Sequence, residues 1–513
     1  MTNKTTYELP NFRLNQMLKF LAAVMFLTAT SVASLPGTAC ALQATASNNA
    51  QDELDVWRGC SMGVRLKPVD GKSEVSELHD YAKGKTDLKE GDQLVAVEGV
   101  EISPLKLDNL TELLQRQSPD TKLSVKVMRD GEVKTIEATA FRKEYVDVPR
   151  ISDMLGRNRI VKQRLEETDR VDFMEDFQQR LTDAVRESKS PRQAYEKMNR
   201  IIDEIDVSHT AFLPGVTYQQ LLSGTGADPG ITLQRHNVGD RDRYFVVDRK
   251  PGTVVHLSNI RLGDEVVRIN GVPIEKSKRL ILAGEEDRHN LFAIEAETNV
   301  NIAIDHQISP FDDLLTTTLN PQEGISTEES FSKSVTTLEF GDKKIGYARF
   351  WNLMSMDVAT RFGKLLEENF AECDAIIMDL RGRGGRVQVV LRIDRLVREC
   401  GKPVIAITDG LTRSAKEMLS YRIKKHDNVT VIGTTTTGAV TGATFSSLPS
   451  GNALMYPALA ADGLKRYLDG NVLEGVGVDP DEEVEFFIPY CGGKDLLIET
   501  AIRRAAQEAT KVR

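Results

Sequence analysis

The chain has 513 residues and a formal net charge of −10 at pH 7. At ~100–200 residues per domain, this length predicts roughly three or four domains, each large enough to bury its own core. The acidic balance and the lack of a basic stripe argue against nucleic acid as a partner. They also give no support to binding at an anionic membrane surface.

The amino terminus has the layout of a secretory signal. Basic residues precede an apolar run from Phe20 to about Leu35, Pro36-Gly37 ends the run, and Ala39-Cys40-Ala41 offers a small-x-small cleavage site. Residues 1–41 are therefore expected to be a signal peptide, with the mature chain exported to a periplasmic or extracellular space. The alternative is an uncleaved membrane anchor, and the membrane is expected as a partner only in that case.

The five cysteines are too few for a disulfide scaffold, and no spacing resembles a zinc site. Cys373 and Cys400 flank one strand–helix unit, so a disulfide and a pair of buried free thiols are both open. The stretch Gly382-Arg383-Gly384-Gly385 lacks the spacing of a phosphate-binding loop. No metal and no cofactor are therefore expected.

A short pattern occurs twice in the chain. Gly91–Val100 and Gly263–Val272 each read as a Gly-Asp turn, an alternating strand and a second turn. An apolar strand with a glycine near its start precedes each copy, at Ser61–Leu66 and at Gly230–Leu233. The pattern resembles the PDZ domain.

This resemblance predicts two PDZ-like, β-rich modules over residues 56–142 and 226–312. In a PDZ domain the loop before the first strand captures a peptide carboxylate through backbone N–H groups, and the peptide adds to the sheet as an edge strand. The residues implied in peptide binding are Met62, Gly63, Val64, Gly230 and Ile231. The alternative is that one or both modules are structural, with a closed groove.

Between the modules the hydrophobic period changes to that of helices. Apolar residues recur at every fourth position, at Phe173, Phe177, Leu181 and Val185. This spacing indicates an amphipathic helix, and Ser190-Pro191 begins a second one. Residues 150–225 are expected to form a helical segment, with Ser208-His209 in a turn just beyond the second helix.

From about residue 335, short apolar strands alternate with helical stretches, which predicts a mostly parallel sheet with crossover helices over residues 335–508. The expected strands are 344–351, 375–380 and 404–408, and the expected helices are 357–370, 387–399 and 415–425. The predicted fold class is therefore a multidomain α+β and α/β protein, with two β-rich modules, a helical segment and a mostly parallel α/β core.

A glycine turn after one strand of this core and a serine at the start of a helix form a layout suited to acyl transfer. Ligand sites in such sheets lie at the carboxyl ends of strands, where Gly384-Gly385 and Ser414 both fall. A serine hydroxyl needs a base and an oxyanion hole, and glycine turns present the backbone N–H groups that build one. The alternative is that Ser414 only caps the helix that follows it.

Two motifs here resemble those of the C-terminal processing (tail-specific) peptidases. They are DLRGRGG at Asp379–Gly385, with Arg383 in place of the usual Asn, and Ser414-Ala415-Lys416-Glu417. Those peptidases also place a lysine base further along the chain, at a position that Ala439 occupies here. Lys416 would point to another face of its helix. A serine–lysine dyad is therefore not expected.

A second branch of that superfamily, typified by the tricorn protease core, lacks this lysine and uses a Ser-His pair and a glutamate. Asp206–Thr210 (DVSHT) and Leu473–Asp481 (LEGVGVDPD) resemble those segments. The resemblance runs from about residue 150 to the end, interrupted by the second module. The roles it implies are nucleophile Ser414, base His209, orienting groups Ser208 and Glu474, and oxyanion N–H groups from Gly384 or Gly385 and from Ala415.

The leading hypothesis is an exported serine endopeptidase of the C-terminal processing class. Its partners would be protein or peptide substrates, engaged through their C-terminal tails by the PDZ-like modules. Because an ordinary imidazole titrates at about pH 6.5, activity should fall as the pH drops through roughly 6–7. The alternative is a peptide-binding scaffold derived from these proteases that has lost catalysis, which Ala439 favours.

Overall fold

The structure is a computed structural model that describes residues 54–55, 57, 59–103, 107–218, 229–283, 290–295, 300–305, 314–319 and 325–511. The chain divides into two units, and all of these residues lie in the second, Glu53–Arg513. The signal peptide expected over residues 1–41 lies outside the described residues. Within them, no helix is both long and apolar enough to cross a membrane.

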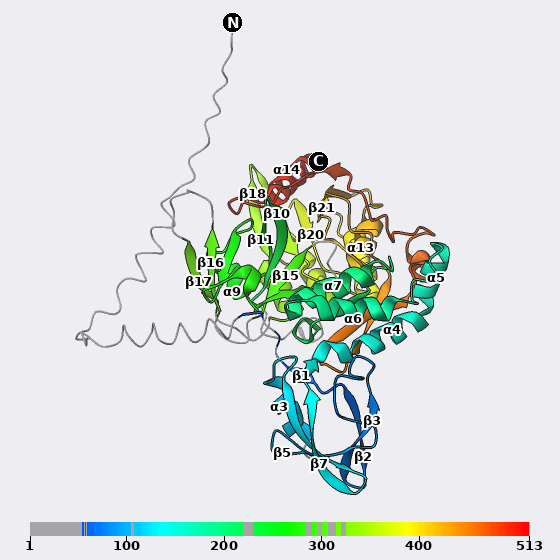
Figure 1. The fold of residues 1–513 in the computed structure, drawn as a ribbon. Coiled ribbons are helices and arrows are strands. Elements are labelled where there is room, and N and C mark those ends of the chain that lie inside the picture. Colours follow the sequence, from blue (N-terminus) through cyan, green and yellow to red (C-terminus); the bar gives the residue numbers. More distant parts are fainter. Residues whose placement is uncertain are drawn as a thin grey trace, which may run out of the picture. The chain divides into compact units, whose positions relative to one another are not determined.

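The first module is a β-sheet with a helix, drawn in blue and cyan in Figure 1. Its elements are β2 (Val64–Val69), β3 (Lys72–Leu78), β4 (Gln93–Val97), β5 (Val100–Glu101), α3 (Leu107–Gln115), β6 (Lys122–Arg129) and β7 (Glu132–Thr139). The strands lie in the order β2-β3-β4-β6-β7, with β5 paired to β4. Alternation builds the sheet, because Leu123, Val125 and Val127 of β6 are buried and the residues between them are exposed. Strand β2 lies at the edge of this sheet.

A short ladder of β1 (Cys60–Ser61) and β8 (Phe141–Arg142) leads into the helical segment. Its elements are η2 (Lys143–Val146), α4 (Val148–Arg157), α5 (Arg159–Glu167), α6 (Phe177–Glu187) and α7 (Pro191–Asp203). The expected helices are present as α6 and α7, but Phe173, which was expected in the first of them, lies in the turn before α6. Ser190 caps α7 by accepting a hydrogen bond from the backbone N–H of Gln193, and Pro191 is its first residue.

The second module is a larger sheet, green in Figure 1. Its elements are β10 (Ile231–Val238), β11 (Arg241–Arg249), α9 (Val254–Leu257), β12 (Glu265–Ile269), β13 (Val272–Pro273), η3 (Ile274–Lys276), β14 (Leu280–Leu282), β15 (Leu291–Ile294), β16 (Val300–Asp305) and β17 (Leu315–Leu319). The strands β10-β11-β12-β16-β17 follow the same order as β2-β3-β4-β6-β7. In the chain position where the first module has helix α3, the second module has strands β14 and β15. Strand β15 pairs with β10.

The α/β core is a six-stranded sheet in the order β18-β19-β20-β21-β22-β25. Its elements are α10 (Thr327–Ser334), β18 (Thr336–Phe340), β19 (Lys343–Arg349), α11 (Met356–Glu367), β20 (Ala375–Asp379), α12 (Val387–Glu399), β21 (Val404–Thr408), α13 (Ala415–Ile423), β22 (Val429–Gly433), β25 (Glu482–Glu483) and α14 (Leu496–Lys511). All pairs from β19 to β25 are parallel, and β18 is antiparallel. The predicted mostly parallel sheet is therefore confirmed.

Both faces of this sheet are covered by helices, which explains why its strands are continuous apolar runs. Along β20, Ile376 and Met378 pack with α11, α12 and α13 in one core cluster, whereas Ile377 packs with α14 in another. The carboxyl ends of β20 and β21 lead into the glycine turn and toward Ser414, respectively. The sheet therefore brings these two segments to the same edge.

A separate three-stranded sheet joins distant parts of the chain. It consists of β23 (Gly442–Ser447), β24 (Ala453–Leu459) and β9 (Ala211–Leu213), in that order, and η4 (Ala461–Tyr467) follows β24. Strand β9 begins two residues after His209 and pairs with β24. The Ser208-His209 turn is thereby tied to the carboxy-terminal part of the core.

Candidate active site

Ser414 lies at the N-terminal end of α13 in a strained conformation, with φ 57° and ψ −127°. Positive φ is disfavoured for residues with a Cβ, and such positions cost about 1–3 kcal/mol and cluster at functional sites. A strained strand-to-helix turn is also how α/β-hydrolases expose a nucleophilic serine. The backbone at Ser414 is thus the kind that presents a hydroxyl for attack.

Glu417 holds this strained turn in place. Its Oε1 accepts hydrogen bonds from the backbone N–H groups of Ser414 (2.9 Å) and Ala439 (2.8 Å). Its Oε2 accepts from the Thr436 hydroxyl (2.7 Å) and the Gly438 N–H (2.6 Å). Burial raises the pKa of Glu417, and these hydrogen bonds oppose that rise. One buried carboxylate therefore joins Ser414 to the loop that carries Ala439.

Ala439 lies directly beside Ser414. The Ser414 N–H donates to the Ala439 carbonyl oxygen at 2.8 Å, and Ala439 is only 4% exposed. The position at which the processing peptidases carry their lysine is thus next to Ser414 in space, but here it has only a methyl group.

Gly384 packs against the serine from the neighbouring turn. A Cβ added at Gly384 would lie 2.6 Å from Cβ and 3.0 Å from Oγ of Ser414. Gly385 packs against Leu353, where an added Cβ would lie 2.3 Å from the leucine Cβ. The Leu353 N–H donates to the Gly384 carbonyl at 2.9 Å, and Arg386 N–H donates to the Leu353 carbonyl at 2.9 Å. The glycine turn is therefore fixed on both sides.

Ser208, His209 and Glu474 form one connected group. Ser208 Oγ lies 3.1 Å from His209 Nδ1, and the Ser208 N–H donates to Glu474 Oε1 at 3.1 Å. The other carboxylate oxygen accepts from the N–H groups of Val440 (2.8 Å) and Thr441 (2.9 Å). Glu474 thus fixes the backbone of Ser208, and Ser208 in turn contacts the imidazole.

The turn that carries His209 is held by a buried amide. Asn199 of α7 donates to the Phe212 carbonyl (2.9 Å) and accepts from the Phe212 N–H (2.7 Å). Since Phe212 is in β9, this pair fixes β9 to α7 and sets the direction of the intervening turn. His209 itself has φ 60° and is buried.

The charge of Arg413, the residue before Ser414, reaches His209. Burial, and then the positive charge of Arg413, hold the pKa of His209 well below its usual range. Arg413 immediately precedes Ser414, so the charge that acts on the imidazole comes from the residue next to that serine. The imidazole is accordingly neutral at pH 7, the form that can accept a proton.

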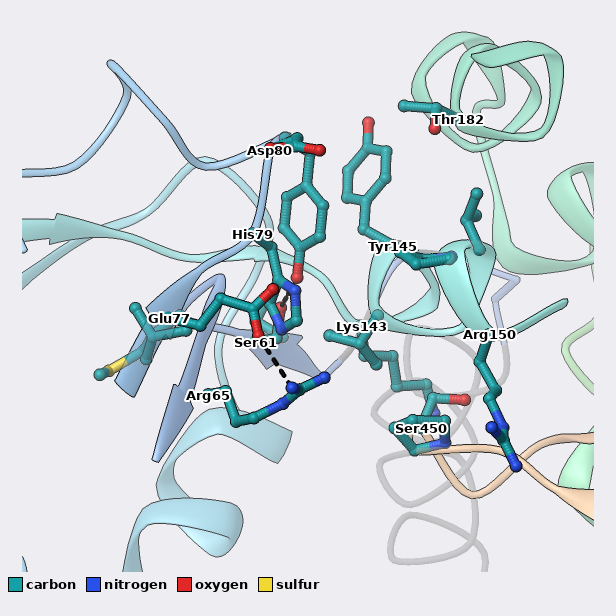
Figure 2. Close-up of a pocket in the computed structure, with 18 of the residues that line it drawn as sticks. Ser61, Arg65, Glu77, His79, Asp80, Lys143, Tyr145, Arg150, Thr182 and Ser450 are labelled. Carbon is teal, nitrogen blue, oxygen red and sulfur yellow. Dashed lines mark hydrogen bonds and ion pairs between the residues drawn. The ribbon is translucent and has the colours of Figure 1, made fainter. Parts of the chain in front are cut away.

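Two of the three peptide-binding residues expected in the first module line a large cavity, and Gly63 does not. Met62 and Val64, together with the strand β2 and helix α3, border a space of about 1490 Å³. Figure 2 shows Arg65, Glu77 and His79 of this module on one side, facing Tyr145, Arg150 and Thr182 of the helical segment. Gly63, with φ 71°, packs on Ala82, where an added Cβ would come within 2.4 Å.

In the second module the corresponding edge is occupied. Strand β15 pairs with β10 in the register Thr232↔Ala293, Leu233↔Phe292 and Gln234↔Leu291. A peptide adding beside Gly230 and Ile231 would have to displace β15. The structure therefore favours the closed-groove alternative for this module.

Two residues that organise the site, Glu417 and Asn199, were not predicted to act in it. Glu417 and Asn199 organise the site through buried hydrogen bonds, and only the Ser-x-x-Glu spacing of a helix start hinted at Glu417. Arg381, beside the glycine turn, donates to the carboxylates of Asp379 (2.6 Å) and Asp495 (2.8 Å). Arg381 is therefore engaged in buried ion pairs.

Among the residues that the structure describes, no three His, Cys, Asp or Glu side chains are grouped so as to hold a metal ion. Cys60, Cys373, Cys400 and Cys491 are free thiols, so Cys373 and Cys400 do not form a disulfide.

Family models match two segments of the chain. Residues 60–139 match the PDZ domain, and residues 394–484 match Peptidase family S41. The second segment contains both Ser414 and Glu474. Over this segment the chain is similar to the family S41 peptidases.

Curated relatives include both branches of these peptidases. A tricorn-like protease C-terminal subunit of Sulfurisphaera tokodaii is 29% identical over 190 residues, covering 32% of this chain and 21% of that protein. A carboxy-terminal-processing protease of Bartonella bacilliformis is 26% identical over 195 residues, covering 36% of this chain and 44% of that protein. The matches thus span less than half of either relative.

Among solved structures, the photosystem II D1 C-terminal processing protease aligns with 67% of this chain and 93% of its own, at 17% identity and a TM-score of 0.41.

Proposed function

We propose that the chain is an exported serine endopeptidase of the C-terminal processing class, with Ser414 as nucleophile and His209 as base. The observations that carry this proposal are the connection from Glu474 through Ser208 to His209 and the strained turn of Ser414. Such a connection orients an imidazole as a base, and a strained turn exposes a hydroxyl. Export rests on the amino-terminal sequence alone.

In the proposed reaction, Ser414 Oγ attacks the scissile carbonyl carbon while its proton passes to Nε2 of His209. Nε2 can accept only if Nδ1 carries the other hydrogen, and Ser208 Oγ lies at 3.1 Å to accept it from Nδ1. The C–N bond then breaks as the imidazolium returns the proton to the leaving amine. Water hydrolyses the resulting ester by the same route.

The negative charge on the carbonyl oxygen would be stabilised by backbone N–H groups. The proposed donors are Ala415 and either Gly384 or Gly385, because Gly384 packs directly on Ser414. Donors of this kind, aimed at a developing oxyanion, contribute about 10²–10³-fold each to turnover.

We further propose that the first module captures the C-terminal tail of the substrate. Strand β2 lies at a sheet edge, and the cavity beside it is lined by Met62 and Val64. A free carboxylate on the peptide would bind the N–H groups of the loop around Gly63. A peptide with a free C-terminus should therefore bind at least tenfold more tightly than its amide, about 1.4 kcal/mol. Equal affinities would reject tail capture.

The test of catalysis is turnover of unfolded casein by the purified, folded chain. Ser414→Ala and His209→Ala should each reduce turnover by about 10³-fold or more, as expected for residues that act as a unit. His256→Ala, at an exposed histidine of α9, is the matched control and should match the wild type. The presence of Ala439 instead of a lysine favours the alternative of a non-catalytic peptide-binding scaffold. Peptide binding without cleavage in the wild type and in all three variants would support that alternative.

A further inference from the structure

Lys416, two residues after the proposed nucleophile, is completely buried. Its relative exposure is 0%, and Nζ donates hydrogen bonds to the carbonyl oxygens of Arg381 (2.9 Å) and Trp351 (3.1 Å). A buried amine is costly unless its N–H groups are paired, and here two of them are. The side chain therefore joins α13 to two other segments of the core.

Both acceptor carbonyls belong to the segments that build the glycine turn. Arg381 precedes the turn, and Trp351 lies two residues before Leu353, whose backbone bonds to Gly384 and Arg386. Arg383, within the turn, places its guanidinium 5.2 Å from the centre of the Trp351 ring. Lys416 thus links the segment before the glycine turn, at Arg381, to the segment that packs on it, at Trp351. It does so from the same helix start that carries Ser414.

The charges around Lys416 are consistent with its role as a hydrogen-bond donor to the two carbonyl oxygens. Burial, followed by repulsion from Arg349, lowers the pKa of Lys416 to about 7, against opposing attraction from Asp379, Asp248 and Asp409. A neutral amine still has two N–H groups, which matches the two carbonyl acceptors. The hydrogen bonds to Arg381 and Trp351 can therefore persist on both sides of neutral pH.

We propose that Lys416 is a positioning residue that fixes the glycine turn, and with it Gly384, relative to Ser414. It is not a base, because its Nζ is directed at two backbone carbonyls in the core. The inference rests on the proposed peptidase function only for its kinetic consequences. Its structural consequence, a turn that loosens when the donor is removed, holds whether or not the chain cleaves peptides.

The experiment compares wild type with Lys416→Met, which keeps the length of the side chain but cannot donate, and with Lys425→Met, an exposed lysine just beyond α13. In Lys416→Met, kcat should fall by about tenfold or more while KM stays within about twofold, because only the transition state uses the oxyanion donors. The affinity for a peptide aldehyde should fall by the same factor as kcat/KM. Lys425→Met should match the wild type.

Amide hydrogen exchange tests the structural role of Lys416 without relying on enzymatic activity. Peptides covering residues 381–386 should exchange about tenfold faster in Lys416→Met, with exchange in α14 unchanged. If Lys416→Met does not fold, Lys416→Gln, which keeps an amide N–H₂ group on a shorter side chain, should show a smaller increase of the same kind.

Three results would overturn the proposal. The first is unchanged exchange and unchanged kcat in Lys416→Met. The second is a loss of turnover as deep as that of His209→Ala without faster exchange in 381–386, which would make Lys416 a base. The third is a proportional rise in KM, which would place Lys416 in substrate binding. A wild type that never cleaves peptides would instead reject the proposed function, and the exchange arm would still decide the role of Lys416.

Discussion

Replacing Gly384 by alanine tests the contact between the glycine turn and the nucleophile. The added Cβ would lie 2.6 Å from Ser414 Cβ, whereas unbonded carbon atoms prefer about 3.5–4.0 Å. About 1 Å of overlap must therefore be relieved by movement. Ser414 is held by Glu417 and Ala439 and the turn by Leu353, so the shift falls on the distance between nucleophile and oxyanion donors.

The expected magnitude follows from this displacement. A misplacement of about 1 Å at a reacting group costs about 10²-fold in rate, which is about 2.7 kcal/mol of transition-state stabilisation. The overlap should also lower stability by about 1–3 kcal/mol, with no added backbone cost, because Gly384 does not have a positive φ and alanine can adopt its backbone. The rate should therefore fall in a variant that is still folded at the assay temperature.

The assay is kcat/KM on a fluorogenic peptide, with thermal unfolding measured on the same samples. Gly410→Ala is the matched control, since Gly410 also follows a core strand, lacks a positive φ and has no atom within 4 Å of an added Cβ. It should retain wild-type kcat/KM. A Gly384→Ala variant as active as Gly410→Ala would refute the placement of the glycine turn against the serine.

Other perturbations test the base and its supports. Glu474→Gln places an amide where two backbone N–H groups donate, so kcat should fall by about tenfold or more, and a wild-type kcat would remove Glu474 from the orienting group. Because burial and Arg413 hold the pKa of His209 below its usual range, the imidazole remains an effective base at lower pH. The acid limb of kcat/KM should therefore lie below about 6.5, and a midpoint above 7 would assign it to another group. Ala439→Lys should not raise kcat, since His209 already serves as base, and activation of an inert wild type would identify a disabled lysine enzyme.

The core was predictable because its signal is local. Continuous apolar runs bounded by glycine turns were enough to predict these elements. Helix α12 has the bounds expected from the sequence, and strand β20 ends at Asp379, one residue earlier than expected. The helix at 415–425 is present as α13 and ends two residues earlier, at Ile423.

Features that depend on contacts between residues far apart in the sequence could not be predicted from local patterns. The contact between Ser208 and Glu474 spans 266 residues, and only motif resemblance suggested it. Strand β15 occupies the edge of β10 through a register that no local pattern specifies. The sequence indicated an ordinary imidazole at His209, whereas its low pKa arises from burial and from Arg413, which only the folded chain brings near.

The central claim is that Ser414 is an activated nucleophile, and labelling by a fluorophosphonate tests it most directly. The folded wild type should react, and mass mapping should place one adduct on Ser414. Ser414→Ala should show no label, and His209→Ala should react more slowly by about 10³-fold. Labelling that survives in Ser414→Ala, or a folded wild type that fails to react, would contradict the account.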